Sequence, residues 1–185
     1  MEATTNTAPR QVVLIRNPAA RRPPSNAELE APLEALRRAG WDVSVQETRG
    51  PGDGAVLAAD AAAAGASVVV ACGGDGTLNE AANGLAGTDT ALAALPGGSS
   101  NVFARTIGLP DDAVEATGAL LDAIEAASIR RIGLGAINDR YFLFHAGIGF
   151  DAAVVERLNG FGFSGIANVL GAIKMAKYHG YGADD

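Results

Sequence analysis

The sequence has little of the chemistry that disulfides, zinc sites and histidine-based catalysis require. Its 185 residues include one cysteine, Cys72, and two histidines, His145 and His179. A single cysteine cannot form an intramolecular disulfide, and no Cys/His cluster is present to hold zinc. There is also no G-x-S-x-G motif, so a Ser-His hydrolase triad is disfavoured. The chain suits a reducing compartment, and we expect Cys72, at a strand end, to be a small buried apolar residue.

Positive charge is also scarce. The sequence has 14 Lys and Arg against 21 Asp and Glu, a net charge of −7, and it has no lysine before Lys174. Binding to nucleic acid depends on cations that neutralise phosphates, so we expect no nucleic-acid partner. The missing lysine also excludes a Walker loop, whose G-x-x-x-x-G-K-[ST] pattern requires one.

Long hydrophobic runs are absent or interrupted. Residues 1–10 are polar and lack the apolar core of a signal peptide. The longest apolar stretch, residues 55–72, is mostly alanine and contains Asp60 and Gly65. It predicts a helix, a turn and a strand rather than a membrane span. We therefore expect a cytoplasmic protein without a transmembrane segment.

What is present is a regular alternation of strand and helix patterns within a composition that is 48% hydrophobic. Short apolar runs typical of buried strands are followed in turn by helical patterns. The strand candidates are residues 11–16, 41–45, 67–72 and 91–95, and the helical patterns end near residues 38, 65, 85, 107 and 127. This alternation predicts a parallel sheet covered by helices on both faces, an α/β domain over residues 1–127.

The pattern changes after residue 127. Two strand candidates, residues 129–137 and 140–145, are joined by the turn residues Asn138-Asp139, which predicts an antiparallel hairpin. Helical patterns follow, and the later one, over residues 166–178, is expected to pack within a second domain, with a membrane-surface helix as the alternative. We predict that residues 128–185 are the incomplete start of an antiparallel β domain.

The strongest chemical signal is the turn Gly73-Gly74-Asp75-Gly76-Thr77, which follows a buried strand and precedes a helix. Glycines let the backbone approach a ligand closely, and the free N–H groups at a helix start favour phosphate. A carboxylate beside phosphate is repulsive unless it faces a metal ion or accepts a proton. Asp75 therefore points to phosphoryl transfer, and the alternative is that it only caps its own helix.

Two further loops follow neighbouring strands. Residues 95–101, Leu-Pro-Gly-Gly-Ser-Ser-Asn, repeat the order of strand end, glycines and polar helix start, and Asn17-Pro18 follows the first strand. Such loops meet at one edge of a parallel sheet, where ligands bind, so we expect a single cleft. The turn is not a dinucleotide-binding G-x-G-x-x-G fingerprint, because Asn79 stands in the place of the third glycine.

Several segments together resemble the diacylglycerol kinase catalytic-domain family of lipid kinases, which includes sphingosine and ceramide kinases. They are GGDGTLNEAANGL, LPGGSSNVFARTIGLP, Asn17-Pro18 and RYFLFHAGIGFDA, and the resemblance runs over residues 11–177. The GGDGT turn alone also resembles those of NAD kinases and 6-phosphofructokinases. The residues that follow it, Asn79-Glu80 and Asn83-Gly84-Leu85, and the spacing to the second loop make the resemblance specific.

The resemblance implies an α/β nucleotide-binding domain followed by a β-sandwich, with ATP and Mg²⁺ in the cleft and a lipid hydroxyl as acceptor. We expect phosphorylation of diacylglycerol to phosphatidic acid in phospholipid biosynthesis, at the inner face of the membrane. By resemblance, Asp75 is the catalytic carboxylate. The nucleotide-binding residues it implies are Asn17, Thr48, Gly73, Gly74, Asp75, Gly76, Thr77, Leu78, Asn79, Glu80, Gly98 and Ser99.

The sequence departs from the family pattern at a few positions. Ser99 stands where the family usually has threonine, Arg21 where glycine is frequent, and Val102 where aspartate is frequent. Bacterial members are longer, and their further magnesium ligands and a glutamate general base lie in the C-terminal portion. We therefore expect the chain to be a fragment and leave its metal ligands unassigned. The alternatives are an NAD kinase-like phosphotransferase and a nucleotide-binding fragment without activity of its own.

Overall fold

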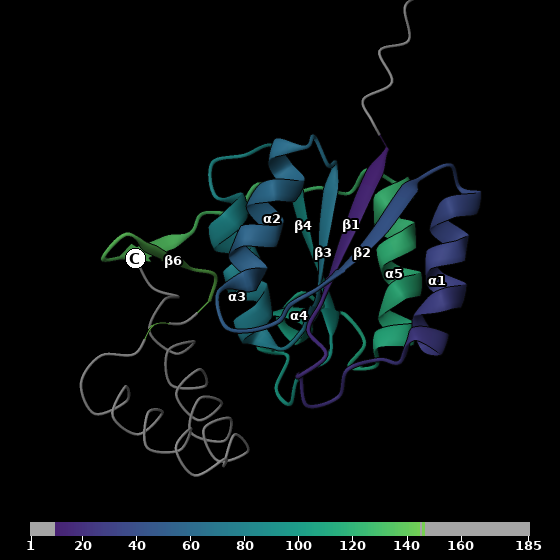
Figure 1. The fold of residues 1–185 in the computed structure, drawn as a ribbon, viewed down its shortest axis with the longest axis horizontal. Helices are drawn as coiled ribbons and strands as arrows, with labels where there is room; N and C mark the ends of the chain where they lie inside the picture. Colours follow the sequence, from purple (N-terminus) through teal and green to yellow (C-terminus); the bar gives the residue numbers. More distant parts are fainter. Residues whose placement is uncertain (1–9, 145, 147–185) are drawn as a thin grey trace, which may run out of the picture. The chain divides into compact units, whose positions relative to one another are not determined.

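The computed structural model describes residues 10–144 and residue 146 (Figure 1). The chain divides after Phe144 into two units, and the account below concerns the first. The expected helix over residues 166–178 lies outside the described residues. The elements are β1 (Gln11–Arg16), α1 (Asn26–Arg38), β2 (Asp42–Glu47), α2 (Asp53–Ala63), β3 (Val68–Gly73), α3 (Asp75–Leu85), β4 (Ala91–Pro96), α4 (Val102–Thr106), α5 (Ala113–Glu125), β5 (Gly135–Ile137) and β6 (Arg140–Phe142).

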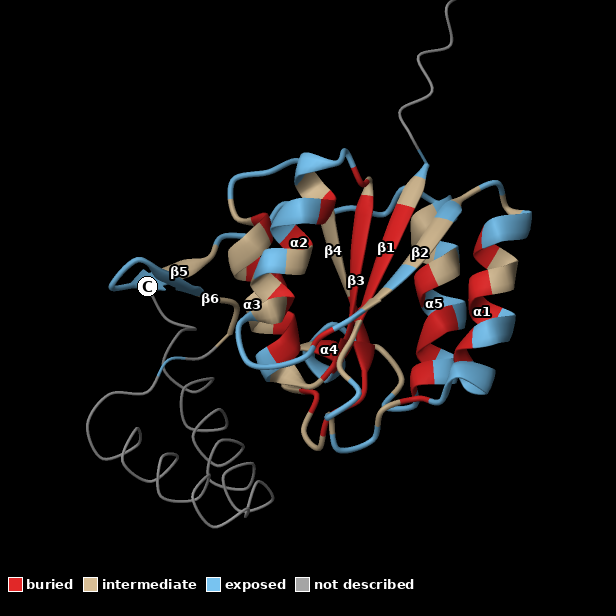
Figure 2. Ribbon diagram, viewed as in Figure 1, coloured by how far each residue is buried: buried red, intermediate tan, exposed pale blue. Residues whose placement is uncertain are grey.

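The first four strands form a parallel sheet in the order β2-β1-β3-β4. Helices α1 and α5 cover one face, and α2 and α3 cover the other (Figure 1). The two central strands, β1 and β3, are buried on both faces (Figure 2), which explains why they read as continuous apolar runs. The predicted α/β fold with a parallel sheet is confirmed.

Side chains of β1 alternate between two separate cores. Val13 and Ile15 pack with residues of α2 and α3, whereas Val12 and Leu14 pack with residues of α1 and α5. This alternation follows from the two-residue period of a strand. The sheet is thus held rigidly from both sides, and the loops at its carboxyl edge are built on a fixed base.

The start of α1 is formed by a capping box. The Ser25 hydroxyl accepts the Glu28 N–H at 3.2 Å, and the Glu28 carboxylate accepts the Ser25 N–H at 2.6 Å. Two amides that the helix leaves unpaired are satisfied in this way. The helix therefore begins at Asn26, directly after this cap.

Cys72 lies near the end of β3 and is 1% exposed. Burial raises the pKa of its thiol to about 11, an effect that the nearby Arg16 only partly offsets. The thiol is therefore protonated at neutral pH and is not a nucleophile. The interpretation of Cys72 as a small buried residue is confirmed.

Strands β5 and β6 form the predicted antiparallel hairpin. Its turn residues, Asn138 and Asp139, have φ of 47° and 61°, as the tight turn of a two-residue hairpin requires. The strands are shorter than expected because residues 129–134 pair with no strand in the described part of the chain, and Ile129 is 65% exposed. The domain boundary at residues 127 and 128 stays a prediction.

Within residues 10–144 and 146, every helix is too short or too polar to cross a membrane. The stretch over residues 55–72, which a hydropathy profile alone could mistake for a span, forms part of α2, a turn and most of β3. That prediction is confirmed.

Helices α2 and α3 pack unusually closely at Gly84. A Cβ atom there would lie 2.1 Å from the Ala55 carbonyl oxygen and 3.0 Å from the Ala58 Cβ. Gly118 in α5 has no atom within 4 Å of a corresponding Cβ position. The two glycines therefore offer a matched test of this contact.

We predict that Gly84→Ala lowers the free energy of unfolding by about 2 kcal/mol, because the methyl group forces the two helices apart. Gly118→Ala should instead raise it by roughly 0.5–1 kcal/mol, since alanine is the better helix former. Urea denaturation followed by circular dichroism measures both. Equal effects of the two substitutions would contradict the close packing of α2 on α3.

Candidate functional site

The strand order β2-β1-β3-β4 places a topological switch point between β1 and β3. Strand β1 leads to α1 on one face of the sheet, and β3 leads to α3 on the other, so the two connections diverge at the carboxyl edge. The Asn17 side chain bridges this point by donating a hydrogen bond to Thr77 Oγ1 at 3.0 Å. Its own Oδ1 accepts the Ala19 N–H at 2.9 Å. The first loop and the glycine turn therefore come together, as predicted.

The second loop packs against the turn through glycines. The Gly97 N–H donates to the Gly73 carbonyl at 2.9 Å. A Cβ atom on Gly98 would lie 2.5 Å from the Gly74 Cα, and one on Gly97 would lie 3.2 Å from the Gly73 Cα. No other residue type allows the two backbones to approach this closely. These glycines are therefore required by the contact between the loops.

Asp75 ties the turn to the second loop from another side. Its Oδ2 accepts the Val102 N–H at 3.0 Å, and its Oδ1 accepts the Phe103 N–H at 3.2 Å. Asp75 is thus a helix cap, but it caps α4 rather than its own helix, which corrects the simpler alternative. Each carboxylate oxygen keeps one further acceptor site, and the half-buried side chain remains partly open to solvent.

The helix N-termini differ in how their unpaired amides are satisfied. Ser25 caps α1, Glu80 caps α2, Asp75 caps α4 and Asp112 caps α5. Helix α3 follows Gly74, which has no side chain, and within the described ranges no side-chain oxygen accepts from its first amides. A helix start with unpaired amides and its positive dipole end favours an anion. Helix α3 is the one helix of the described region in this state.

Gly76 stands in the first turn of α3 and is exposed. It differs from the other glycines of the turn because a Cβ atom there would meet nothing within 4 Å, and its φ lies outside the left-handed region. Neither packing nor backbone conformation therefore requires glycine at this position. A ligand that has to approach the helix start closely would require glycine here.

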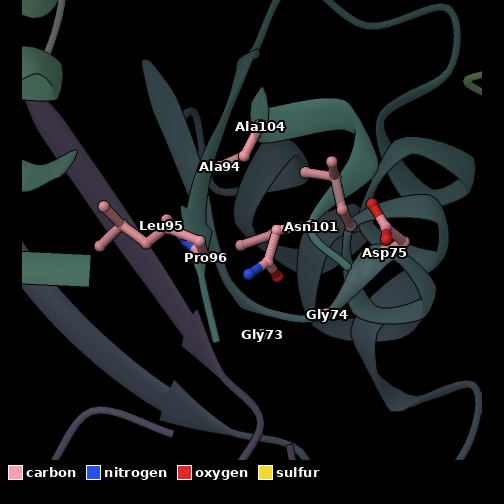
Figure 3. A pocket seen from close by; sticks show the side chains of 10 residues that line it. Gly73, Gly74, Asp75, Ala94, Leu95, Pro96, Asn101 and Ala104 are labelled. Atoms are coloured by element: carbon pink, nitrogen blue, oxygen red, sulfur yellow. The ribbon is translucent and has the colours of Figure 1, made fainter. Parts of the chain in front are cut away.

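A small cavity lies under the two loops, lined among others by Gly73, Gly74, Asp75 and Asn101 (Figure 3). Its volume is about 10 Å³, which is roughly what one water molecule needs. A nucleotide needs a site of several hundred Å³ (about 300–1,000). The cavity is therefore a packing gap, and the open side of the turn, where Gly76 is exposed, is the surface available to a larger ligand.

Sequence reasoning missed a polar network that holds the second loop. Asn101 has φ of 44°, its Oδ1 accepts the Gly98 N–H at 2.9 Å, and its Nδ2 donates to Asp111 at 2.9 Å. Asp111 also accepts from Arg22 at 3.1 Å, and the Arg22 N–H donates to the Gly97 carbonyl at 2.8 Å. The pKa of the Asp111 carboxyl is lowered, mainly by the hydrogen bond from Asn101 and further by the hydrogen bond and charge of Arg22. An asparagine that ends a glycine loop was the available signal, since asparagine tolerates left-handed backbone.

Three of the expected nucleotide-binding side chains make contacts within the protein, and their contact with a nucleotide stays a prediction. Leu78 is 4% exposed and belongs to the core. Glu80 accepts the N–H groups of Gly52 and Gly54 at 2.9 and 3.1 Å. Asn79 bonds to the backbone of the β5–β6 hairpin. These side chains are therefore committed to holding α3 in place.

Two further predicted residues lie on the carboxyl edge of the sheet. Thr48 is buried just after β2, and its N–H donates to the Arg16 carbonyl at 2.9 Å. Ser99 lies in the second loop and accepts from Arg21 at 3.5 Å, the long limit for a hydrogen bond. Their contact with a nucleotide stays a prediction.

The described residues hold no group of three or more His, Cys, Asp or Glu side chains that could form a metal site by themselves. Asp75 is the single acid of the turn, and its remaining acceptor sites can supply at most part of a coordination shell. Magnesium is commonly held by one or two carboxylates together with substrate phosphates. One carboxylate beside a phosphate-binding helix start fits that mode.

Comparison with known proteins places this site in a family. The diacylglycerol kinase catalytic domain matches residues 11–137. A probable lipid kinase YegS-like protein of Chromohalobacter salexigens is 37% identical, over 83% of this chain and 51% of the relative. A diacylglycerol kinase of Bacillus subtilis is 34% identical, over 74% of this chain and 45% of the relative. The chain spans about half the length of the curated relatives it matches.

Solved structures agree with these sequence matches. The crystal structure of a diacylglycerol kinase from Bacillus anthracis superimposes with a TM-score of 0.60 at 29% identity, over 72% of this chain and 46% of that one. A putative diacylglycerol kinase of the same organism gives a TM-score of 0.56 at 27% identity, over 72% and 48%. The α/β fold is therefore shared.

We predict that Asp75→Asn lowers the free energy of unfolding by about 1–2 kcal/mol, because one of the two capped N–H groups then faces an amide NH₂ and is left unpaired. Asp112→Asn is the matched control, since one oxygen, Oδ1, accepts both N–H groups at the start of α5, at 2.8 and 3.0 Å. An asparagine can keep both of those bonds, so the loss there should be a few tenths of a kcal/mol. Urea denaturation of both variants decides, and equal losses would refute the two-oxygen cap on α4.

Proposed function

Because the chain belongs to the diacylglycerol kinase catalytic-domain family, we propose that it forms the nucleotide-binding part of a lipid kinase. This kinase transfers the γ-phosphoryl group of ATP to a lipid hydroxyl, with diacylglycerol as acceptor and phosphatidic acid as product. The names of the relatives support a lipid acceptor over NAD. The reaction is expected at the membrane surface, where the acceptor lies.

One observation carries the proposal. Among the helices of the described region, α3 begins without a capping side chain, at the point where the connections from β1 and β3 diverge. Carboxylates or a hydroxyl cap the starts of the other four described helices, and the start of α3 has no such cap. An anion such as a nucleotide phosphate is the ligand that this helix start favours.

In the proposed site, the backbone of Gly74, Asp75, Gly76 and Thr77 surrounds the phosphates. Gly76 leaves room for them to approach the first amides of α3, and Asn17 holds the Thr77 hydroxyl at 3.0 Å. Magnesium, when bound with ATP, would neutralise phosphate charge during transfer. The chain's own contribution is to position the phosphates and to provide donors that need no rearrangement.

Asp75 is proposed to act on the acceptor side of the reaction. Its two oxygens are fixed by the Val102 and Phe103 amides, so the carboxylate has one orientation. The acceptor sites that remain can take the proton of the lipid hydroxyl, or bind a magnesium-coordinated water molecule. Fixing the carboxylate before the substrates arrive removes a reorganisation step from the reaction.

The other expected nucleotide-binding residues divide into two groups in this proposal. Thr48, Gly98 and Ser99 lie on the carboxyl edge and are proposed to border the nucleotide. Leu78, Asn79 and Glu80 act indirectly, by anchoring α3 to the core, to the hairpin and to α2. Activity of the chain without the remaining length of its relatives is a separate question for experiment.

The test of the proposed function offers labelled ATP and magnesium to the chain together with diacylglycerol in mixed micelles, and in parallel with NAD. We expect label in phosphatidic acid. Label in NAD would overturn the lipid assignment. Saturable ATP binding without transfer to either acceptor would show that this chain is a nucleotide-binding module alone.

We predict that Asp75→Asn reduces transfer by about 100-fold or more while ATP affinity changes little, because general acid–base catalysis contributes roughly 10²–10⁴-fold. Asp112→Ala removes the cap of α5 without a change at the turn, so it controls for loss of a cap and should leave transfer unchanged. Equal turnover of Asp75→Asn and the wild type would remove Asp75 from the reaction.

We predict that Gly76→Ala weakens ATP binding at least tenfold, about 1.4 kcal/mol, without lowering stability. The methyl group meets no protein atom within 4 Å and would obstruct only a ligand. Gly118→Ala places a methyl group in similarly open space on α5 and should leave ATP affinity within about twofold. Isothermal titration calorimetry measures both, and unchanged affinity of Gly76→Ala would place the phosphates elsewhere.

A further inference from the structure

Two asparagines of α3 bind the backbone of strand β6. Asn83 Oδ1 accepts the Tyr141 N–H at 2.8 Å, and Asn83 Nδ2 donates to the Tyr141 carbonyl at 2.9 Å. Asn79 Oδ1 accepts the Leu143 N–H at 3.2 Å, and Asn79 Nδ2 donates to the same Tyr141 carbonyl at 3.3 Å. We call these two side chains the amide clamp. They occupy the edge of β6 as a neighbouring strand would.

The spacing of the amide clamp matches that of a strand. Residues four apart on a helix are separated by about 6.0 Å along its axis, and residues two apart on a strand by about 6.7 Å. Asn79 and Asn83 are four apart, and Tyr141 and Leu143 are two apart. In the hairpin register, Tyr141 pairs with Ala136 one step beyond the turn pair, so its backbone groups point away from β5. The clamp therefore meets the groups that the hairpin itself leaves unpaired.

The clamp also sets a direction. Tyr141 is held by Asn83 and Leu143 by Asn79, so the chain of β6 runs antiparallel to α3, toward the helix start. The next residue, Phe144, has its ring centroid 6.5 Å from that of Phe103 in α4. The Phe103 N–H is one of the two that hold Asp75. The clamp thus directs the chain leaving β6 to the neighbourhood of the turn.

The choice of residues supports a dedicated role. Asparagine is a poor residue inside a helix, yet α3 carries two on the face that meets the hairpin. Exposed helix positions are better filled by alanine, glutamate or lysine when helix stability is the sole requirement. An edge strand with unpaired groups, in turn, needs a partner to be satisfied. The two asparagines therefore satisfy the edge of β6 at some cost to the stability of α3.

We propose that Asn79 and Asn83 are positioning residues that set the register of the chain leaving β6 relative to the turn and Asp75. They contact neither nucleotide nor acceptor and act through the hairpin backbone. The consequence for the reaction rests on the proposed function, whereas the register itself does not. A one-residue slip of β6 would turn its backbone groups to the opposite edge and move Phe144 away from Phe103.

The first experiment measures amide hydrogen exchange by NMR in the 185-residue chain. Asn83→Ala should accelerate exchange at Tyr141 roughly tenfold, and Asn79→Ala should do so at Leu143, because each removes the acceptor of that one amide. Thr88→Ala is the matched control, since it removes a hydrogen bond of 2.8 Å to Leu85 at the end of the same helix. Unchanged exchange at both amides in the double alanine variant would overturn the clamp.

The second experiment separates positioning from simple stabilisation. In the double variant Asn79→Ala/Asn83→Ala we expect loss of the nuclear Overhauser effect between the Phe103 and Phe144 rings, a kcat for lipid phosphorylation at least tenfold lower, and a KM for ATP within about twofold. Loss of amide protection with an unchanged kcat would refute the positioning role. If the wild-type chain binds ATP but transfers no phosphate, it is a nucleotide-binding module alone, and kcat gives no test of the clamp. The exchange pattern and the ring contact then decide the clamp by themselves.

Discussion

The contact between two glycine-rich loops is the constraint on which the rest of this site depends. Backbone meets backbone at Gly73–Gly97 and Gly74–Gly98, so the two loops have no side chains with which to adjust their distance. Their relative position is set instead from outside the contact. Asp75 bonds the start of α4. Asp111 accepts hydrogen bonds from Asn101 of the second loop and from Arg22 of the loop after β1, and so links these two loops.

The same arrangement decides where negative charge can bind. A protein with a net charge of −7 has carboxylates available for its helix starts, and it uses them at α2, α4 and α5. A hydroxyl serves α1. Among the described residues, α3 alone begins without a side-chain cap on its first amides, and the acid in its first turn, Asp75, turns its oxygens to α4. The occupied helix starts thus distinguish the start of α3 from the other described ones as much as its own free amides do.

Local patterns predicted most of the fold, because they depend on residues that are close in sequence. The apolar strand runs and the Asn138-Asp139 turn are of this kind. Bonds between distant residues were not predictable in the same way. Nothing near Asp75 in sequence shows that its carboxylate turns to α4. In the same way, nothing near Asn79 shows that it bonds to Leu143, which lies 64 residues later. Motif resemblance groups such residues by sequence, and the structure shows the contacts that each of them makes within the protein.

Helix α3 has a consequence for reading sequences of this kind. Its side chains are distributed over the core, α2, α4 and the hairpin, while the first amides of the helix have no side-chain cap among the described residues. Most residues of GGDGTLNEAANGL therefore pack or anchor the helix, and few are free to take part in chemistry. A paralogue that has lost its activity but keeps the fold would retain nearly the whole motif. Recognition of an active member is better based on the residues whose glycine or carboxylate the scaffold does not itself require, of which Gly76 is the clearest case.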